Sequence, residues 1–290
     1  MPLCWGPRRR RVTPLSTAGR QPFGVNIFPD AVVRAQIGDD GGMHVRPGPE
    51  AAEKRPAHHR RVTSFRSRRS TLSDSQQATW QRRWPELGQQ ARTEDGTGFA
   101  PLDTADWFGR TAPLVLEVGC GTGISTLGMA QAEPDLDVIA VEVYKKGLAQ
   151  LLSAIDRSDP PVTNIRLIRG DGLEVLQHLI SPGSLTGVRV FFPDPWPKAR
   201  HHKRRLLQPE TLTLIADRLR PGGVLHAATD HADYAEHIAE IGAGHPLLCR
   251  VTDRHELATL PISVARPTTK YEAKAAEVGS AINEFIWVRV

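Results

Sequence analysis

Asp194 and the basic residues that follow it are the part of this sequence whose types and spacing could most directly do chemistry. The carboxylate lies between Pro193 and Pro195, and both prolines restrict the backbone that carries it. A run of cationic and histidine side chains comes next: Lys198, Arg200, His201, His202, Lys203, Arg204 and Arg205. A fixed carboxylate beside such a run suits a site that holds a polyanion and contacts one polar group on it. The alternative is a solvated charge run after a buried strand.

Three glycines after Glu117 form a second candidate site. Gly119, Gly121 and Gly123 permit a tight turn and let the backbone approach a ligand closely. The dinucleotide fingerprint needs its third glycine where this sequence has Ile124, and the Lys-Ser/Thr pair of a P-loop does not follow. A nicotinamide-dependent oxidoreductase is therefore disfavoured.

Acidic residues recur where the predicted strands end: Glu117, Glu142, Asp171, Asp194 and Asp230. Because ligands of open α/β sheets bind outside the carboxyl ends of the strands, we expect these five residues to line one crevice. Taken singly, each could be an ordinary helix cap or turn residue. Five carboxylates disfavour a nucleotide with free phosphates and favour a ligand with a positive centre, a ribose and a base. S-adenosylmethionine fits, because it carries a sulfonium and an ammonium group and no phosphate.

Alternating apolar segments predict the elements that would position these residues. We predict strands at residues 114–118, 138–143, 165–168, 188–192 and 224–228. We predict helices at residues 124–132, 146–155, 173–180, 209–220 and 232–241, and Pro221 with the two glycines after it stops the fourth. The alternation is typical of an α/β fold with a doubly wound, mostly parallel sheet. Residues 282–290 predict a last strand, which we expect to be antiparallel.

Positive charge is concentrated near the start of the chain. The first 70 residues hold 14 Lys/Arg and 5 Asp/Glu, whereas the remaining residues hold 23 and 27. We interpret residues 1–59 as a disordered basic arm and residues 60–290 as one domain with an N-terminal helical extension. In that extension, Ser73 and Gln76 have the spacing of a capping box. A basic arm together with a local cationic patch favours a nucleic-acid partner.

Some classes of protein are disfavoured by what the sequence lacks. The three cysteines are far apart and show no metal-ligand spacing, so we expect no metal. No segment has the pattern of a signal peptide or the length of a membrane span, so we expect a cytoplasmic protein with no membrane partner. The sequence leaves a monomer and a homodimer equally open.

Taken together, these motifs resemble those of the bacterial tRNA (guanine-N7)-methyltransferase family. The resemblance rests on residues 116–123, 141–143, 170–172, 192–205, 228–230 and 266–272, and it extends from about residue 60 to the end of the sequence. It implies a class I methyltransferase with a Rossmann-like fold that uses S-adenosylmethionine. It also implies methylation of N7 of a guanine in the variable loop of tRNA, at tRNA position 46, to give 7-methylguanosine.

The resemblance assigns roles to individual residues. Cofactor binding is implied for Glu117, Gly119, Gly121, Gly123, Glu142, Asp171 and Asp194, and Asp194 is also the implied catalytic residue. Substrate binding is implied for Lys198, Asp230, Thr269, Lys270, Tyr271 and Glu272. Contacts with the RNA backbone are implied for Arg200, His201, His202, Lys203, Arg204 and Arg205.

The chemistry of guanine N7 sets the role expected of Asp194. N7 carries an exposed lone pair and no proton, so the reaction needs alignment and no general base. We hypothesise that Asp194 orients the base and stabilises the positive charge that develops on the purine. Two other interpretations stay open: a class I methyltransferase that acts on another base or on a small molecule, and a tRNA-binding module without turnover.

Overall fold

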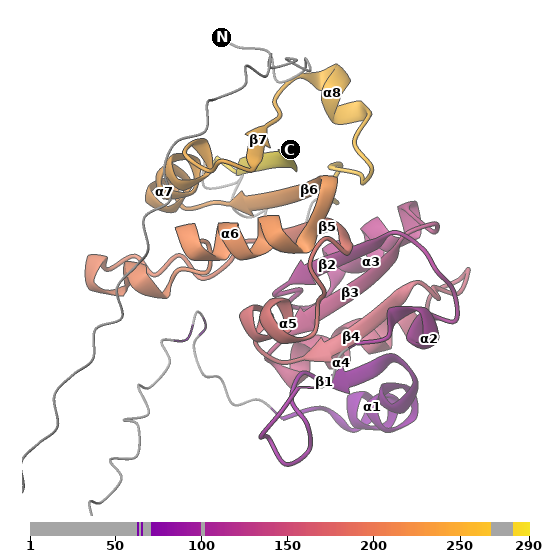
Figure 1. Cartoon of the computed structure of the whole chain (residues 1–290). Helices are drawn as coiled ribbons and strands as arrows, with labels where there is room; N and C mark the ends of the chain where they lie inside the picture. The colour runs from indigo at the N-terminus through magenta and orange to yellow at the C-terminus, as the bar shows by residue number, and fades with distance from the viewer. Residues whose placement is uncertain (1–62, 64, 66–70, 100–101, 268–280) are drawn as a thin grey trace, which may run out of the picture. The chain divides into compact units, whose positions relative to one another are not determined.

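The computed structural model describes residues 63, 65, 71–99, 102–267 and 281–290. All of them belong to one compact unit within residues 61–290, and Figure 1 shows the described residues in colour. The predicted arm at residues 1–59 lies outside the described residues, as do four of the predicted substrate residues: Thr269, Lys270, Tyr271 and Glu272. The predicted domain boundary stays a prediction.

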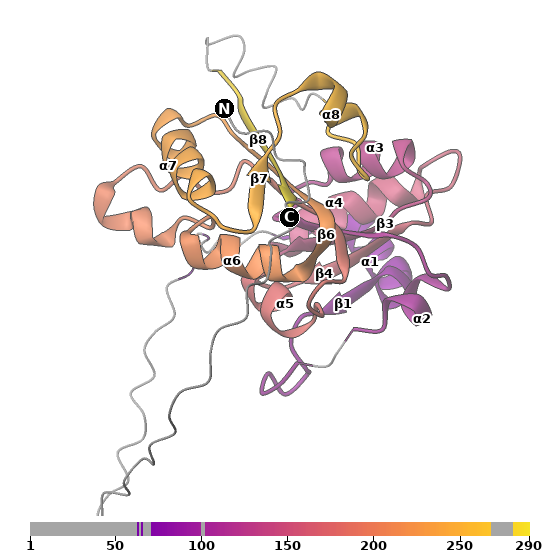
Figure 2. The ribbon, with the colours of Figure 1, turned by 45° about the horizontal axis from the view of Figure 1, so that its top comes forward.

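The described strands form one eight-stranded sheet in the order β1-β4-β3-β2-β5-β6-β8-β7. Their bounds are Gly88–Gln90 for β1, Leu114–Val118 for β2, Asp137–Glu142 for β3, Ile165–Arg169 for β4, Leu185–Phe191 for β5, Leu219–Thr229 for β6, Leu248–Arg250 for β7 and Asn283–Arg289 for β8. From β1 to β6 in this order all pairs are parallel, whereas β8 pairs antiparallel with β6 and with β7 (Figure 2). The predicted α/β fold, with a doubly wound, mostly parallel sheet and an antiparallel last strand, is confirmed.

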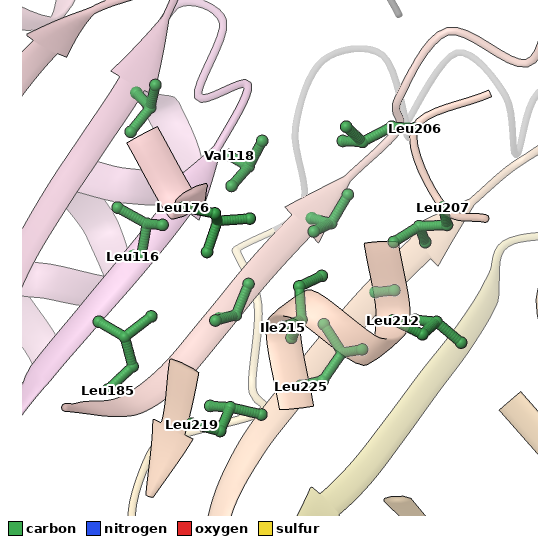
Figure 3. Close-up of a cluster of buried hydrophobic side chains, with 14 of the residues drawn as sticks. Leu116, Val118, Leu176, Leu185, Leu206, Leu207, Leu212, Ile215, Leu219 and Leu225 are labelled. Carbon is green, nitrogen blue, oxygen red and sulfur yellow. The ribbon is translucent and has the colours of Figure 1, made fainter. Parts of the chain in front are cut away.

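Helices cover both faces of the sheet, and this explains why β2, β3 and β5 are buried along their whole length. One face is covered by α5 (Gly172–His178), α6 (Pro209–Arg218) and α7 (Ala232–Ala243), and the other by α1 (Asp74–Leu87), α3 (Ile124–Ala132) and α4 (Lys145–Asp156). Side chains alternate between the faces along a strand, so Leu116 and Val118 belong to the first core and Val115 to the second. Figure 3 shows the first core, with Leu212 and Ile215 of α6 over the sheet. Three further helical segments are short: α2 (Thr104–Phe108), α8 (Arg254–Ala258) and the 3₁₀ helix η1 (Ala199–Arg204).

The predicted helical extension is α1, and its predicted capping box is present. The Ser73 hydroxyl accepts the N–H of Gln76, and the Gln76 side chain accepts the N–H of Ser73. Trp80 and Trp84 stack with their ring centroids 4.1 Å apart. The chain then passes under the Trp84 ring at Gly88, where a Cβ atom would lie 2.3 Å from the ring. Gly88 therefore lets β1 turn directly from the helix onto the edge of the sheet, where it pairs with β4.

Several element boundaries differ from those predicted. Helix α6 ends at Arg218, and β6 begins at Leu219 rather than at residue 224. The pairing of β6 with β5 shifts between Leu219 and Val224, because the exposed residues 220–222 bulge from the ladder and Gly222 adopts a φ of +77°. The strands β1 and β7 were not predicted, because three residues are too few to show a period.

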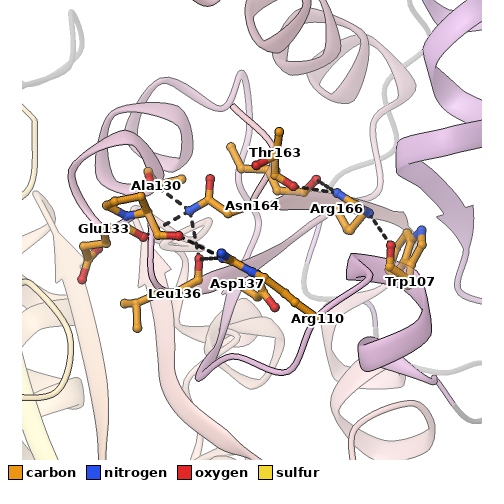
Figure 4. A network of polar contacts seen from close by, with 11 residues as sticks. Trp107, Arg110, Ala130, Glu133, Leu136, Asp137, Thr163, Asn164 and Arg166 are labelled. Atoms are coloured by element: carbon orange, nitrogen blue, oxygen red, sulfur yellow. Dashed lines mark hydrogen bonds and ion pairs between the residues drawn. The ribbon is translucent and has the colours of Figure 1, made fainter. Parts of the chain in front are cut away.

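A polar network closes the sheet at the amino ends of β3 and β4 (Figure 4). The side-chain amide of Asn164 donates to the carbonyl oxygens of Ala130, Glu133 and Leu136, at 3.0, 3.1 and 2.9 Å. Nearby, the Arg110 guanidinium donates to the Asp137 carboxylate at 2.9 Å. These bonds satisfy buried carbonyl groups at the end of α3 and in the turn into β3. They stabilise the amino ends of these strands, and the candidate site lies at the opposite, carboxyl ends.

Candidate active site

A cavity of about 890 Å³ opens at the carboxyl ends of the parallel strands. Its lining includes the five acids predicted to share one crevice: Glu117, Glu142, Asp171, Asp194 and Asp230. Among the described lining residues, Lys146 is the one basic side chain, so the cavity is strongly acidic. Gly119 and Gly121 also line it, whereas Gly123 and the basic run from Lys198 to Arg205 do not.

The glycine turn after β2 is held by the end of β3. The Glu142 carboxylate accepts the backbone N–H groups of Gly121, Val143 and Tyr144 at 3.0, 2.7 and 2.9 Å. Gly119 and Gly121 have φ values of +78° and +58°, and a Cβ atom at either would meet nothing within 4 Å. This backbone is therefore open to close approach by a ligand. Gly123 has a different role, because a Cβ atom there would lie 2.6 Å from the Leu151 side chain of α4.

Glu117 offers an unpaired acceptor to the cavity. Only 2% of the residue is exposed, and its Oε2 atom accepts no hydrogen bond from the described residues. Burial raises the pKa of its carboxyl group, while the positive charges of Arg189 and Arg266 act in the opposite direction. A buried polar atom without a partner is costly, so this oxygen is suited to a cationic group of a ligand.

The turn that carries Asp194 is bracketed by two strained residues. Phe192 and Trp196 have φ values of 50° and 45°, which cost about 1–3 kcal/mol each for bulky side chains. The N–H of Phe192 donates to the carbonyl oxygen of Ala228 at 2.8 Å, which ties the turn to β6. The Trp196 ring is buried, and the Arg204 guanidinium lies 3.9 Å from its centroid. The Asp194 side chain is thus presented to the cavity by a conformation that its surroundings must maintain.

The basic run divides into exposed and packed residues. Lys198, Arg200 and Lys203 are exposed on or beside η1, whereas His201, His202 and Arg204 are half-buried. Arg204 donates to the carbonyl oxygen of Thr63 at 3.3 Å in addition to its contact with Trp196. Three exposed cations therefore remain beside the cavity as an available surface.

Arg205, for which an RNA contact was predicted, is buried within the protein. Only 3% of this residue is exposed, and its guanidinium donates to the Pro195 carbonyl oxygen at 2.9 Å and pairs with Asp233. These contacts within the protein engage the Arg205 guanidinium, and its RNA contact stays a prediction.

The capping alternative applies to Asp171 and fails for Asp230. Asp171 caps α5, where its carboxylate accepts the N–H of Leu173 at 2.9 Å. Helix α7 is capped by His231, whose ring accepts the N–H of Tyr234, so the exposed carboxylate of Asp230 is not used as a cap. Asp230 therefore lines the cavity and does not cap α7.

Two buried arginines beneath the cavity were missed by the sequence reasoning. Arg189 pairs with Glu133 at 2.5 Å, and Arg266 pairs with Glu284 at 2.7 Å. The Arg266 guanidinium also lies 5.2 and 5.0 Å from the ring centroids of Phe191 and Phe192. A single arginine within the apolar residues 185–192 was a usable signal, because a buried charge requires a partner of opposite charge.

Within the described part of the chain, no group of three or more His, Cys, Asp or Glu side chains could hold a metal ion. The helices in that part are also too short or too polar to cross a membrane.

Comparison with known proteins identifies relatives of the whole described unit. A family model described as "Putative methyltransferase" matches residues 111–285. The tRNA (guanine-N(7)-)-methyltransferase of Mycolicibacterium gilvum is 63% identical over 265 residues, covering 87% of this chain and 99% of that protein. The protein of the same name from Mycolicibacterium paratuberculosis is 62% identical over 269 residues, covering 87% and 100%. Among solved structures, the aminoglycoside resistance methyltransferase NpmB1 is 16% identical, covers 67% of this chain and 97% of its own, and has a TM-score of 0.42.

Proposed function

Because this chain belongs to the tRNA (guanine-N(7)-)-methyltransferase family, we propose that it transfers the methyl group of S-adenosylmethionine to N7 of a guanine in tRNA. The product is 7-methylguanosine, and the proposed target is position 46 in the variable loop. The observation that carries the proposal is the acidic cavity at the carboxyl ends of the parallel strands, with the Asp194 turn and exposed cations at its side.

The residues of the cavity fit S-adenosylmethionine. The unpaired Oε2 atom of Glu117 would accept a hydrogen bond from its ammonium group. The Glu142 carboxylate lines the cavity at the end of β3, where a carboxylate can accept a ribose hydroxyl while its backbone bonds keep it in place. The open backbone at Gly119 and Gly121 leaves room for the ligand beside these two carboxylates. When bound, S-adenosylmethionine supplies an electrophilic methyl carbon on a sulfonium.

Asp194 acts on the substrate through its charge. Guanine N7 has a lone pair and no proton at neutral pH, so no residue has to remove one. Positive charge develops on the purine as the methyl group is received, and a fixed carboxylate stabilises it. Asp194 lies in the cavity wall and on a constrained turn, so it is positioned before the substrate arrives.

The tRNA side of the site is proposed to combine cations with a base-reading group. Lys198, Arg200 and Lys203 are exposed and would contact phosphates. Asp230 would accept from the ring N–H and the amino group of guanine, which adenine does not present in the same arrangement. The further substrate residues proposed from the family resemblance lie outside the described residues: Thr269, Lys270, Tyr271 and Glu272. A cytoplasmic location, where tRNA is found, is part of the proposal, and the choice between monomer and homodimer stays open.

The direct test is transfer of a labelled methyl group. The full chain is incubated with methyl-labelled S-adenosylmethionine and an unmodified tRNA transcript, and the digested nucleosides are separated. The expected result is label in 7-methylguanosine, with chain scission specific to that nucleoside at position 46. Label in another nucleoside would show that the methyl acceptor is an atom other than guanine N7. Tight tRNA binding without any transfer would favour a binding module instead.

A further inference from the structure

Arg205 is enclosed between the Asp194 turn and helix α7. Its Nε atom donates to the carbonyl oxygen of Pro195 at 2.9 Å, and its Nη2 atom pairs with the carboxylate of Asp233. The guanidinium lies 4.8 Å from the centroid of the Tyr234 ring, which forms the floor beneath it. The guanidinium is thus engaged by the protein on several sides, so its charge serves the fold of this turn rather than an external ligand.

The carbonyl group that Arg205 holds lies next to the proposed catalytic carboxylate. Pro195 follows Asp194 directly, and Trp196 after it has a φ of 45°. Arg204 covers the Trp196 ring at 3.9 Å, so neighbouring arginines hold the carbonyl group and the ring that follows it in the turn. Residues in this strained region persist only where their surroundings leave no alternative.

We infer that Arg205, oriented by Asp233, is a positioning residue that fixes the turn carrying Asp194. This inference rests on the proposed function only for its kinetic readout. Without the guanidinium, the Pro195 carbonyl group loses its donor and the turn can relax toward unstrained backbone angles. Asp194 would then move relative to the reacting atoms, and a displacement of about 1 Å can reduce a rate by about 100-fold.

Two substitutions of opposite charge separate positioning from RNA binding. Arg205→Gln removes a positive charge, and Asp233→Asn removes a negative charge on a side chain that is 55% exposed. If Arg205 orients the turn, both variants lower kcat, Arg205→Gln by about 10-fold to 100-fold, with the KM for tRNA within a few-fold of wild type. If Arg205 contacts phosphate, the two variants shift the KM for tRNA and its salt dependence in opposite directions, and kcat stays near wild type.

Arg200→Gln is the matched control, because it removes the same charge from an exposed position of the same run. It should raise the KM for tRNA and leave kcat near wild type. Thermal unfolding of each variant identifies loss of folding, and Asp233→Asn keeps the test valid if Arg205→Gln does not fold. A wild-type kcat in Asp233→Asn, or a higher KM with unchanged kcat in Arg205→Gln, would overturn the inference.

Hydrogen exchange provides a readout that is independent of catalysis. The backbone N–H groups of the non-proline residues of segment 192–199 should exchange faster in Arg205→Gln and Asp233→Asn than in wild type and in Arg200→Gln: Phe192, Asp194, Trp196, Lys198 and Ala199. Equal exchange in all four proteins would contradict the positioning role even if tRNA is not the substrate. Absence of methyl transfer in the wild type, with the exchange difference present, would remove the proposed function and leave this role of Arg205 intact.

Discussion

Glu117 of β2 and Arg189 of β5 occupy paired positions on neighbouring parallel strands, and both side chains are buried. The arginine bonds Glu133 on its other side, so one cation lies between two carboxylates below the cavity. Its Nε and Nη1 atoms make no hydrogen bond with the described residues. Part of the charge balance under the candidate active site therefore comes from a group that does not line it.

Arg189→Met should strongly destabilise the protein. Removing one partner of a buried pair leaves the remaining charge uncompensated, which costs about 3–5 kcal/mol. Urea unfolding of the purified protein measures this loss. Arg82→Met removes an exposed guanidinium paired with Asp156 and should change the free energy of unfolding far less. Equal decreases in the free energy of unfolding of the two variants would show that the buried Arg189 pair stabilises the protein no more than the exposed Arg82 pair.

Glu117→Gln should weaken cofactor binding while stabilising the ligand-free protein at neutral pH. Burial raises the pKa of this carboxyl group, so its contribution to stability is present below its ordinary value of 4.5 and is lost as the pH rises through the folded value. The side-chain amide of the Glu117→Gln variant does not ionise, so the variant does not lose this stability. The free energies of unfolding of the variant and the wild type should therefore diverge as the pH rises from 4 to 8. The Kd for S-adenosylmethionine should rise about 10-fold to 100-fold, because a charged hydrogen bond contributes about 1.5–3 kcal/mol. Glu256→Gln, on the surface of α8, should bind as wild type does.

Asp194→Asn should reduce kcat for methyl transfer by about 100-fold to 1,000-fold, as loss of one group that stabilises transition-state charge does elsewhere. The amide keeps the shape of the carboxylate and removes its charge. The Kd for S-adenosylmethionine should stay within a few-fold of wild type, measured by calorimetry. Asp135→Asn, at an exposed position outside the cavity, is the control. Full turnover in Asp194→Asn would leave this carboxylate without its proposed role.

The double variant Arg200→Gln with Lys203→Gln should weaken tRNA binding and reduce its salt dependence. For every phosphate that is no longer neutralised, the slope of log K against log salt should become shallower by about 0.7–0.9. Binding to tRNA is measured by filter retention across a salt series. A second double variant, Arg157→Gln with Arg254→Gln, removes the same charge from exposed positions elsewhere. Identical slopes for the two pairs would place the RNA on another surface.

Asn164→Leu should destabilise the fold without changing the cavity. The substitution removes one donor from three carbonyl oxygens. The Glu133 oxygen keeps the N–H of Leu136 and the Leu136 oxygen keeps Arg110, so the loss falls mainly on the Ala130 oxygen, and an unsatisfied buried group costs about 1–3 kcal/mol. Urea unfolding gives the loss, and the Kd for S-adenosylmethionine should match wild type. Thr213→Ala removes two exposed hydrogen bonds, to the carbonyl oxygen of Pro209 and to the His245 ring, and should be nearly neutral. A loss as small as that of Thr213→Ala would show that water replaces the Asn164 amide.

The sequence predicted the long buried strands and their order of alternation with helices, because apolar runs of five to seven residues carry a clear pattern. The sequence also predicted that the acidic residues after these strands lie together, because the carboxyl ends of parallel strands lie on the same side of the sheet. It could not distinguish Arg205 from Lys203, because both belong to one basic run. What separates them is Asp233, which approaches Arg205 only after α7 has packed against the sheet.

The insertion of β8 between β6 and β7 has a consequence for synthesis of the protein on the ribosome. Strands β2 to β6, whose carboxyl ends carry the five acids, can pair with each other before residues 283–289 have emerged. Until then β6 presents an open edge, and β7 has no neighbour to join. A nascent chain halted at this stage would already hold the acidic cavity while one side of its sheet remained available to pair with another chain.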